Sequence, residues 1–506
     1  MKKDAVDVVL VNPGGRSAIY QSLGDQLSAI EPPVWAGLMA TFLRRRDFSV
    51  QVVDADAENL TPEETADRIV SMGPLLTAVV VYGHHPSAST QTMPAAGAIC
   101  SVLKKTGPSR KIIMVGGHVA ALPERTLREE EIDFVAAGEG LITLSELLMA
   151  LKSNRPNDFT HVSGLLYREG ENVRFNPPAP LVKELDGEMP EVAWDLLPID
   201  RYRAHNWHCF EDHQRQPYAA LYTTLGCPFH CTFCCIQAPF KSGEKVTGLK
   251  EGINSYRYWS PEAVIAQIDL LVTRYGVRNI KFADEMFVLN PQHVMGVCDR
   301  IIERGYRLNI WGYARVDTIR ENMLEKLKRA GFYLLSFGIE AASERVRDDV
   351  QKGFGQEEIF KTLDKVREAG IHIGANYIFG LPEDDMKSMQ ATLDLALEVN
   401  AEWPNFYCAM AYPGSQLYTL ALQNGWPLPE RWSGYSQYSV DTLPLPTNHL
   451  SAGEVLRFRD QAFQVYFNNP RYLEMITRKF GAETTRHIRE MASYRLVRHY
   501  AATEAG

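Results

Sequence analysis

Short hydrophobic runs alternate with amphipathic stretches over the first 150 residues of the chain. The hydrophobic runs predict strands at 7–11, 49–54, 77–82, 111–115 and 134–136. The amphipathic stretches predict helices at 34–46, 62–72, 88–105 and 124–131. Strands that alternate with helices in this way are typical of a doubly wound α/β domain with a parallel sheet.

The next segment, 153–215, has a different pattern. Two short runs, 164–168 and 173–176, are joined by the polar residues 169–172, and this arrangement predicts a hairpin. Prolines at 177, 178, 180, 190 and 198 then interrupt regular structure. We therefore expect a connector between two larger units.

A second alternation begins near residue 218. Strands are predicted at 219–223, 279–282, 308–311, 333–338, 372–379 and 405–410, with helices such as 261–275, 291–304, 322–330 and 384–398 between them. Six such units predict an open or partial parallel (β/α)6 barrel, with its chemistry at the carboxyl ends of the strands. Residues 447–500 form a helical tail rich in aromatic residues and arginine, which either caps the barrel or lines a substrate cavity.

These patterns divide the 506 residues into four parts: 1–152, 153–215, 216–425 and 426–506. The composition is that of a folded protein, with 45% hydrophobic and 23% charged residues. A formal net charge of −9 argues against non-specific binding to nucleic acids or membrane surfaces. No apolar run reaches 18 residues, and the first residues resemble a strand more than a signal peptide. We expect a cytoplasmic protein without a nucleic-acid or membrane partner.

Polar loops that contain glycine follow four of the predicted strands in the first unit. They are 12–15, 83–87, 116–118 and 138–140. In a doubly wound sheet these loops share one edge, so they would admit a large ligand close to the backbone. No GxGxxG pattern follows the first strand, which disfavours a dinucleotide.

Four of the eight cysteines lie within 227–235, immediately after the first predicted barrel strand. Cys227, Cys231 and Cys234 form the pattern CxxxCxxC. Three thiolates suit an iron–sulfur cubane that has one iron without a protein ligand. A structural zinc site and a simple electron-transfer cluster are the alternatives from spacing alone. We expect the Cys235 side chain to point away from this loop.

The three cysteines, with Phe233 before the last of them, resemble the CxxxCx(aromatic)C signature of radical S-adenosylmethionine (SAM) enzymes. The resemblance implies a [4Fe–4S] cluster held by Cys227, Cys231 and Cys234. Its fourth iron would take the amino and carboxylate groups of SAM. Phe233 would lie against the adenine.

Later segments are similar to further SAM-binding motifs of this family. Asp284 and Glu285 match the acidic motif that holds the SAM amino group, and Glu340 and Ser343 match the motif near the ribose and carboxylate. The stretch 376–383 is similar to GxIxGxxE, with Asn in place of the first glycine. It implies contacts from Ile378, Gly380 and Glu383. Arg315 is expected to meet the SAM carboxylate.

A doubly wound unit ahead of such a barrel resembles the cobalamin-dependent (class B) radical SAM enzymes, over about residues 5–425. Residues 115–118 match the VGG segment of that family, and 138–143 are similar to its GEGE-T segment. The resemblance implies cobalamin contacts from Asn12, Gly83, His84, Ser87, Gly116, Gly117, His118, Gly138 and Glu139. The DxHxxG motif is absent, so we expect cobalamin without a histidine ligand. His84, His85 and His118 would then form hydrogen bonds or pack.

The resemblance also implies an activity. A 5′-deoxyadenosyl radical would remove hydrogen from a small-molecule or natural-product intermediate, and methylcobalamin would methylate an unactivated carbon (or phosphorus). The electron donor would be a protein such as flavodoxin or ferredoxin. Oxidative cyclisation or rearrangement without methyl transfer is the alternative within the family. A non-catalytic cobalamin or cluster sensor is the alternative from another class.

Overall fold

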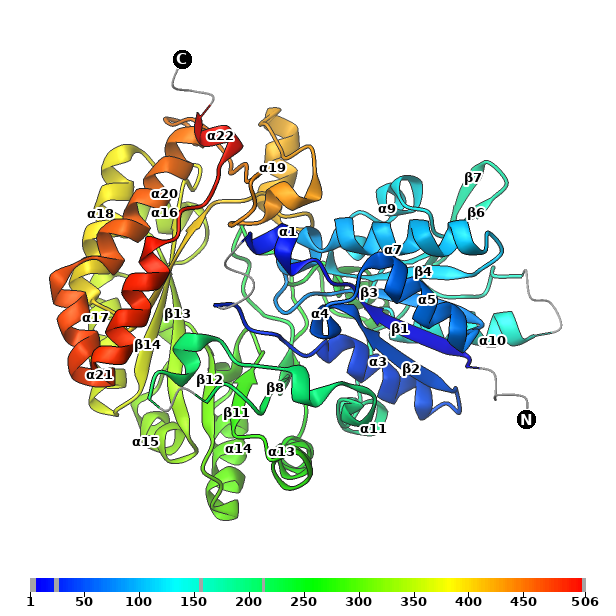
Figure 1. The fold of residues 1–506 in the computed structure, drawn as a ribbon, viewed down its shortest axis with the longest axis horizontal. Coiled ribbons are helices and arrows are strands. Elements are labelled where there is room, and N and C mark those ends of the chain that lie inside the picture. Colours follow the sequence, from blue (N-terminus) through cyan, green and yellow to red (C-terminus); the bar gives the residue numbers. More distant parts are fainter. Residues whose placement is uncertain (1–5, 22–26, 154–157, 212–213, 503–506) are drawn as a thin grey trace.

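The computed structural model describes residues 6–21, 27–153, 158–211 and 214–502. Two α/β units lie beside each other, one blue to cyan and the other green to yellow (Figure 1). The carboxyl-terminal helices, in orange and red, lie on the outer side of the second unit (Figure 1). The expected order of a doubly wound domain, a parallel barrel-like sheet and a helical tail is confirmed.

The first unit is built on a seven-stranded sheet. Five strands are parallel in the order β2-β1-β3-β4-β5, with bounds Val8–Asn12 (β1), Val50–Asp54 (β2), Leu76–Val81 (β3), Ile112–Gly116 (β4) and Phe134–Ala136 (β5). Alternate residues of β1 enter different cores, since Val8 and Leu10 belong to one hydrophobic cluster and Val9 and Val11 to another. Helices therefore cover both faces. They are α3 (Val34–Arg44) and α10 (Leu141–Lys152) on one face, and α5 (Pro62–Met72) and α7 (Met93–Thr106) on the other.

The predicted hairpin forms but does not act only as a connector. Strands β6 (Leu165–Glu169) and β7 (Asn172–Phe175) extend the first sheet, with β6 antiparallel to β5. Leu165 and Leu166 are buried on the two faces of the sheet. The hairpin covers the edge of β5, whose unpaired backbone groups would otherwise face solvent.

The second unit is an open six-stranded parallel sheet. Its order is β8-β11-β12-β13-β14-β15, with bounds Tyr218–Leu221 (β8), Asn279–Phe282 (β11), Asn309–Ala314 (β12), Phe332–Glu340 (β13), His372–Phe379 (β14) and Trp403–Cys408 (β15). Helices α13 (Pro261–Tyr275), α14 (Pro291–Arg304), α15 (Glu321–Arg329), α17 (Gln356–Glu368) and α18 (Met386–Val399) join the strands. No ladder joins β8 to β15 within the described ranges, so the barrel stays partial.

Helix α20 (Ala452–Phe467) packs against the β15 edge, and α21 (Pro470–Ser493) packs against α20. Arg459 Nε donates to the Phe406 carbonyl at 2.8 Å, and the Tyr466 hydroxyl donates to the Ala401 carbonyl at 2.8 Å. The tail thus completes the wall that the sheet leaves open. The helical tail is expected either to cap the barrel or to line a cavity. Helix α20 does both, since it also lines the cavity described below.

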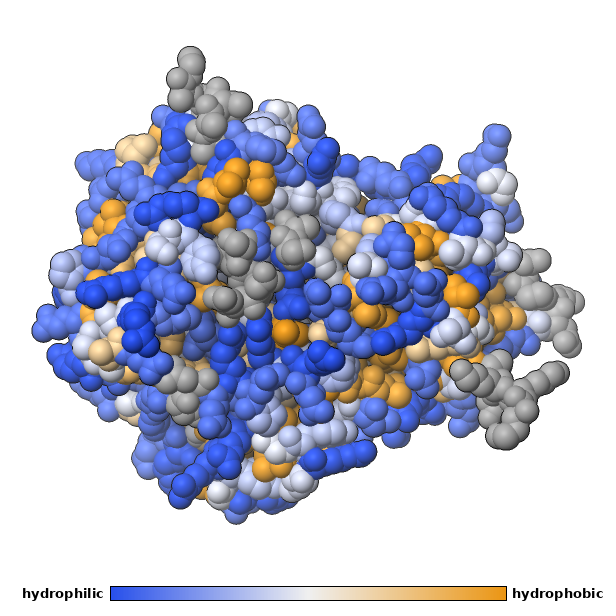
Figure 2. All heavy atoms as spheres, in the orientation of Figure 1, coloured by the Kyte–Doolittle hydropathy of each residue, from blue (hydrophilic) through white to orange (hydrophobic). Residues whose placement is uncertain are grey.

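Buried polar contacts join the two units. Arg257 pairs with Glu139 at 2.7 Å, and Lys281 pairs with Glu31 at 3.3 Å. The Tyr218 hydroxyl also donates to Glu31, at 2.6 Å. On the face in Figure 2, hydrophilic residues predominate and hydrophobic residues form small separate groups. Among the described residues, no helix is both long and apolar enough to cross a membrane.

Candidate active site

The cysteine loop follows β9 (Thr224–Leu225), at the carboxyl end of the first barrel strand. Gly226 has φ 87°, and a Cβ at this position would overlap the Ser255 carbonyl, so glycine is required. The Cys227 amide donates to Gln237 Oε1 at 3.1 Å, and Asn254 Nδ2 donates to the Phe229 carbonyl at 2.7 Å. These bonds fix the loop from behind and turn its cysteines inward.

Cys227, Cys231 and Cys234 all line one large cavity. Burial raises the pKa of Cys227 to about 12, so this thiol needs a bound metal to become a thiolate. No three His, Cys, Asp or Glu side chains in the described part of the chain are placed to hold a single metal ion. A cubane spreads its thiolates over different irons, and this donor set fits it better than it fits zinc. Cys235 also lines the cavity, but unlike the other three cysteines it borders a second, smaller pocket as well, and its exclusion from the ligand set stays a prediction.

The cavity has a volume of about 790 Å³ and lies between the two units. Arg315 lies beside the cluster loop, with Nη1 3.6 Å from Cys231 Sγ and its guanidinium 3.9 Å from the Phe229 ring centroid. Asp317 pairs with this guanidinium at 2.9 Å. Phe233 and Ile378 line the same cavity.

Two acidic residues expected to bind SAM face this cavity. Glu340, at φ 66°, pairs with Lys352 at 2.8 Å. Burial raises the pKa of Glu285 to about 8, and its Oε2 has no hydrogen-bond partner among the described residues. A buried carboxyl oxygen without a partner suits a cationic amino group, so Glu285 fits the expected contact with SAM.

Four other residues expected to bind SAM do not line the cavity. Asp284 is fully buried and accepts hydrogen bonds from the Thr223 amide at 3.0 Å and from the Thr223 hydroxyl at 2.7 Å, so it fixes the segment between β8 and β9. Ser343 precedes helix α16 (Glu344–Asp349) without a side-chain cap. The Gly380 amide donates to Asp384, and Glu383 pairs with Arg345 at the surface. These contacts give the residues' places in the fold, and their expected contacts with SAM stay predictions.

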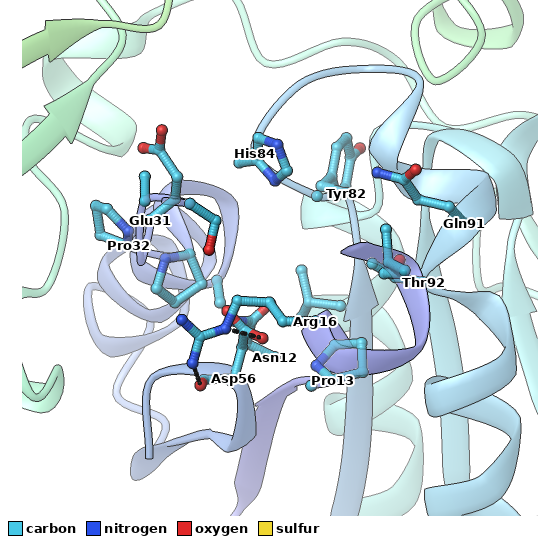
Figure 3. A pocket seen from close by; sticks show the side chains of 18 of the residues that line it. Asn12, Pro13, Arg16, Glu31, Pro32, Asp56, Tyr82, His84, Gln91 and Thr92 are labelled. Atoms are coloured by element: carbon cyan, nitrogen blue, oxygen red, sulfur yellow. Dashed lines mark hydrogen bonds and ion pairs between the residues drawn. The ribbon is translucent and has the colours of Figure 1, made fainter. Parts of the chain in front are cut away.

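In the first unit, the edge expected to meet cobalamin is hollowed where the strand order reverses, between β1 and β3. The pocket there is lined by Asn12, Gly83 and His84 (Figure 3). Arg16 pairs with Asp56 at 3.2 Å on one side, and Glu31 lies on the other (Figure 3). Ligands of doubly wound sheets bind at such reversal points.

The remaining residues expected to contact cobalamin divide into two groups. Ser87 lines the large cavity, whereas Gly117 and His118 line a smaller pocket that also contacts Cys235 and Glu285. Gly116, Gly138 and Glu139 line none of these three spaces. A Cβ at Gly116 would overlap the Val81 carbonyl, and one at Gly138 would lie 3.0 Å from Ser242 Oγ, while Glu139 pairs with Arg257. These contacts place the three residues at the β3–β4 contact and at the interface between the units, and their expected contacts with cobalamin stay predictions.

The strand-end histidines make hydrogen bonds. His84 Nε2 lies 3.4 Å from the Tyr20 hydroxyl, and His118 Nδ1 lies 3.2 Å from Thr90 Oγ1. His85 Nδ1 accepts from the Ala88 amide at 3.1 Å, which leaves the ring proton on Nε2. All three histidines thus have side-chain hydrogen-bond partners, and cobalamin binding without a histidine ligand stays a prediction.

Sequence reasoning missed two lysines of the cavity wall. Lys281 is 2% exposed and donates to the His84 carbonyl at 3.1 Å, besides its pair with Glu31. Lys352 neutralises Glu340. A lysine inside the otherwise buried strand β11 was a usable signal, because a lysine is seldom fully buried without a partner.

Comparisons with known proteins match the two units to two families. Residues 221–396 match the radical SAM superfamily, and residues 21–148 match the B12 binding domain. "Uncharacterized methyltransferase PH0819" of Pyrococcus horikoshii is 28% identical over 467 residues, which cover 92% of this chain and 93% of that protein. "Anaerobic magnesium-protoporphyrin IX monomethyl ester cyclase" of Rubrivivax gelatinosus is 24% identical over 79% of this chain and 68% of its own.

A solved structure shares the fold over nearly the whole chain. It is the radical S-adenosylmethionine methyltransferase TsrM from Kitasatospora setae, with cobalamin and a [4Fe-4S] cluster bound. The TM-score is 0.68 at 15% identity, and the alignment covers 96% of this chain and 99% of that one.

Proposed function

Since this chain is a cobalamin-dependent radical SAM enzyme, we propose that it methylates an unactivated carbon, or phosphorus, of a small-molecule or natural-product intermediate. One observation carries the proposal. A single cavity is lined by the three cluster cysteines on the barrel side and by His84 and Ser87 on the side of the first unit. A substrate held there would face both cofactor sites.

When bound, the cluster, SAM and cobalamin supply one-electron cleavage of SAM and a transferable methyl group. The protein residues bind and orient these groups. Arg315 places a positive charge beside the cluster loop, and Glu285 offers a carboxyl oxygen to a cationic group. The pairs Lys352–Glu340 and Lys281–Glu31 line the cavity without excess charge. Tyr313, Trp311 and Tyr407 cover the wall between them and exclude water from reactive intermediates.

Cyclisation or rearrangement without methyl transfer is the second candidate function, because relatives from three organisms are named as cyclases. A sensor without turnover is disfavoured by the size of the cavity and by the arginine and carboxylates around its cysteine loop. We propose a flavodoxin or ferredoxin as the electron donor and the cytoplasm as the location.

The test uses anaerobically reconstituted protein, cobalamin, a reductant and SAM with a deuterated methyl group. With its substrate, a methyltransferase should form S-adenosylhomocysteine and 5′-deoxyadenosine in near-equal amounts. Without substrate it should still transfer the deuterated methyl group to cobalamin, detectable by mass spectrometry. Formation of 5′-deoxyadenosine with neither S-adenosylhomocysteine nor labelled methylcobalamin would favour the cyclase or rearrangement alternative. If neither by-product formed, the protein would be a sensor without turnover.

A variant separates the two uses of SAM. In Glu340→Ala, 5′-deoxyadenosine should fall much further than methylated cobalamin, because Glu340 lines the cavity on the cluster side. Equal losses of both products would contradict a role restricted to the SAM on the cluster.

A further inference from the structure

A buried guanidinium lines the cavity beside the middle of β15. Arg459 is 4% exposed, and its Nε is fixed by the Phe406 carbonyl at 2.8 Å. The cluster loop lies farther along the strand, where Phe233 packs in one hydrophobic cluster with Ala409. At about 3.3 Å per residue, three strand residues separate these levels by about 10 Å. Arg459 therefore belongs to a part of the cavity away from the cluster.

The charge around Arg459 is not balanced. Arg459 Nη1 donates to Asp460 at 2.8 Å, but Arg498 also binds this carboxylate, through Nε at 3.0 Å and Nη2 at 3.0 Å. Two buried cations thus share one carboxylate. Arg459 Nη2 donates to no described residue, and Arg495, which is exposed to solvent, also lines the cavity. A buried cation that lacks a full counter-charge is costly, and an anionic ligand would remove this cost.

The other charged groups that line the cavity leave this excess unchanged. Lys281 pairs with Glu31, Lys352 with Glu340, and Arg315 with Asp317. The remaining carboxyl group, Glu285, follows β11, which three strands separate from β15 in the sheet. The positive wall is therefore confined to the side formed by β15, α20 and the segment that contains Arg495.

An aromatic surface lies towards the amino-terminal end of β15, on the other side of Arg459 from the cluster loop. Trp207 meets Trp311 edge to face at 4.8 Å and stacks with Trp403 at 5.8 Å between centroids, and all three line the cavity. Trp403 precedes Phe406 by three residues, so this surface lies about 10 Å from the level of Arg459. Indole faces and edges favour a flat ring as a partner.

We propose that this side of the cavity is the substrate subsite, and that it takes a molecule with a flat apolar ring and an anionic group, which Arg459 binds. The inference rests on the proposed function, since the molecule anchored at this subsite would extend from it towards the cluster loop, where it is methylated. The anionic group is a carboxylate or a phosphate, because both accept paired hydrogen bonds from a guanidinium. The carboxylate of SAM is expected near Arg315, on the cluster side of the cavity.

The test measures binding without turnover. The full chain with its cluster and cobalamin is titrated by calorimetry with 2-naphthylacetate, 2-naphthylacetamide and 2-naphthyl phosphate. The native protein should bind one or both anions at least tenfold more tightly than the neutral amide, since a buried hydrogen bond between charged groups is a strong one. A comparison of the affinities for 2-naphthylacetate and 2-naphthyl phosphate shows whether the subsite prefers a carboxylate or a phosphate. Equal affinity for the amide and both anions would overturn the proposal.

Variants then locate the contact. Arg459→Gln should reduce the affinity for the anion to that for the amide, and Arg459→Lys should retain part of the preference. Arg478→Gln, on the exposed face of α21, should change nothing. Trp311→Leu should reduce the affinity for 2-naphthylacetate and the affinity for 2-naphthylacetamide by the same factor. A preference that persists in folded Arg459→Gln would overturn the assignment of Arg459.

Two further measurements distinguish a contact with the substrate from a contact with a cofactor. Iron and cobalamin contents of Arg459→Gln should equal those of the native protein. Loss of cobalamin from this variant would show that the guanidinium binds the cofactor, and would overturn the proposal. If the native protein prefers the anion but makes neither S-adenosylhomocysteine nor methylcobalamin, methyl transfer fails while the anion subsite remains.

Discussion

Four thiols lie within nine residues of the cluster loop, and all four line the cavity. Exposure to the cavity therefore does not identify the ligands, whereas the spacing within the signature does. Cys227→Ala, Cys231→Ala and Cys234→Ala should each abolish the cluster. Cys235→Ala should keep about four irons per chain, measured by iron assay and visible absorption after anaerobic reconstitution. If Cys235→Ala lost the cluster and Cys234→Ala kept it, the ligand assignment would be wrong.

Two neighbouring glycines should respond differently to substitution. Gly117 borders the smaller pocket, and a Cβ there would lie 3.5 Å from Ser89 Oγ, an ordinary contact. Gly117→Val should therefore fold and keep its iron but retain less cobalamin, because the added methyl groups would occupy space next to the corrin. Gly116→Ala should instead lower the thermal midpoint, because its Cβ would overlap the Val81 carbonyl. Stoichiometric cobalamin in Gly117→Val would remove the proposed contact.

Adjacent residues also show where sequence reasoning ends. Asp284 and Glu285 fit one acidic motif equally well, yet Asp284 binds Thr223 inside the fold and Glu285 faces the cavity. The motif predicts that an acid follows β11. The local backbone decides which of the two carboxylates points inward, and no periodicity applies to a loop.

At the scale of elements, a buried carboxylate joins the tail to the barrel. Glu402 precedes β15, accepts from the Ile373 amide at 2.9 Å, and contacts His372 and Lys479 of α21. Burial alone would raise its pKa, but His372 and Lys479 hold the pKa of Glu402 at about 2. Its contribution to stability is therefore complete above the ordinary pKa, near 4.5, and is lost as the pH falls from there towards 2.

Glu402→Gln should destabilise the protein by about 3 kcal/mol at pH 7, because it leaves Lys479 and His372 without their carboxylate partner. The loss should be smaller at pH 3, where part of the native contribution has already disappeared. Denaturant midpoints at both pH values measure this difference, with Glu474→Gln on exposed α21 as the control. An equal loss at both pH values would contradict the role of the charge.

The elements themselves could largely be predicted from the sequence. Strands β5, β11 and β14 and helix α5 have the predicted bounds, because period-2 and period-3.6 patterns report local burial. The role of β6 and β7 could not be predicted, since pairing with β5 depends on which edge is free. The predicted helix 88–105 is divided into α6 (Ala88–Gln91) and α7, with Thr92 between them and Pro94 at the start of α7.

At the scale of the whole molecule, the activity proposed here depends on how the two units face each other. The sequence predicts both units and the edge of each that carries the loops. The two edges enclose one cavity, and the ion pairs Arg257–Glu139 and Lys281–Glu31, together with a hydrophobic cluster that runs through both units, join them. Such pairs join residues more than 100 positions apart, and their partners cannot be identified from one sequence.

The segments that form the cavity walls are also synthesised at different times. They include residues from Tyr20 to Leu496, whereas the first sheet is complete at Phe175. A ribosome adds about 5–20 residues per second, so the last wall emerges roughly 15–65 s after that sheet is complete. During this interval the β1–β3 edge is open to the surrounding medium. Cobalamin could therefore meet the loop edge of the nascent first unit before the anion subsite, which needs β15 and α20, exists.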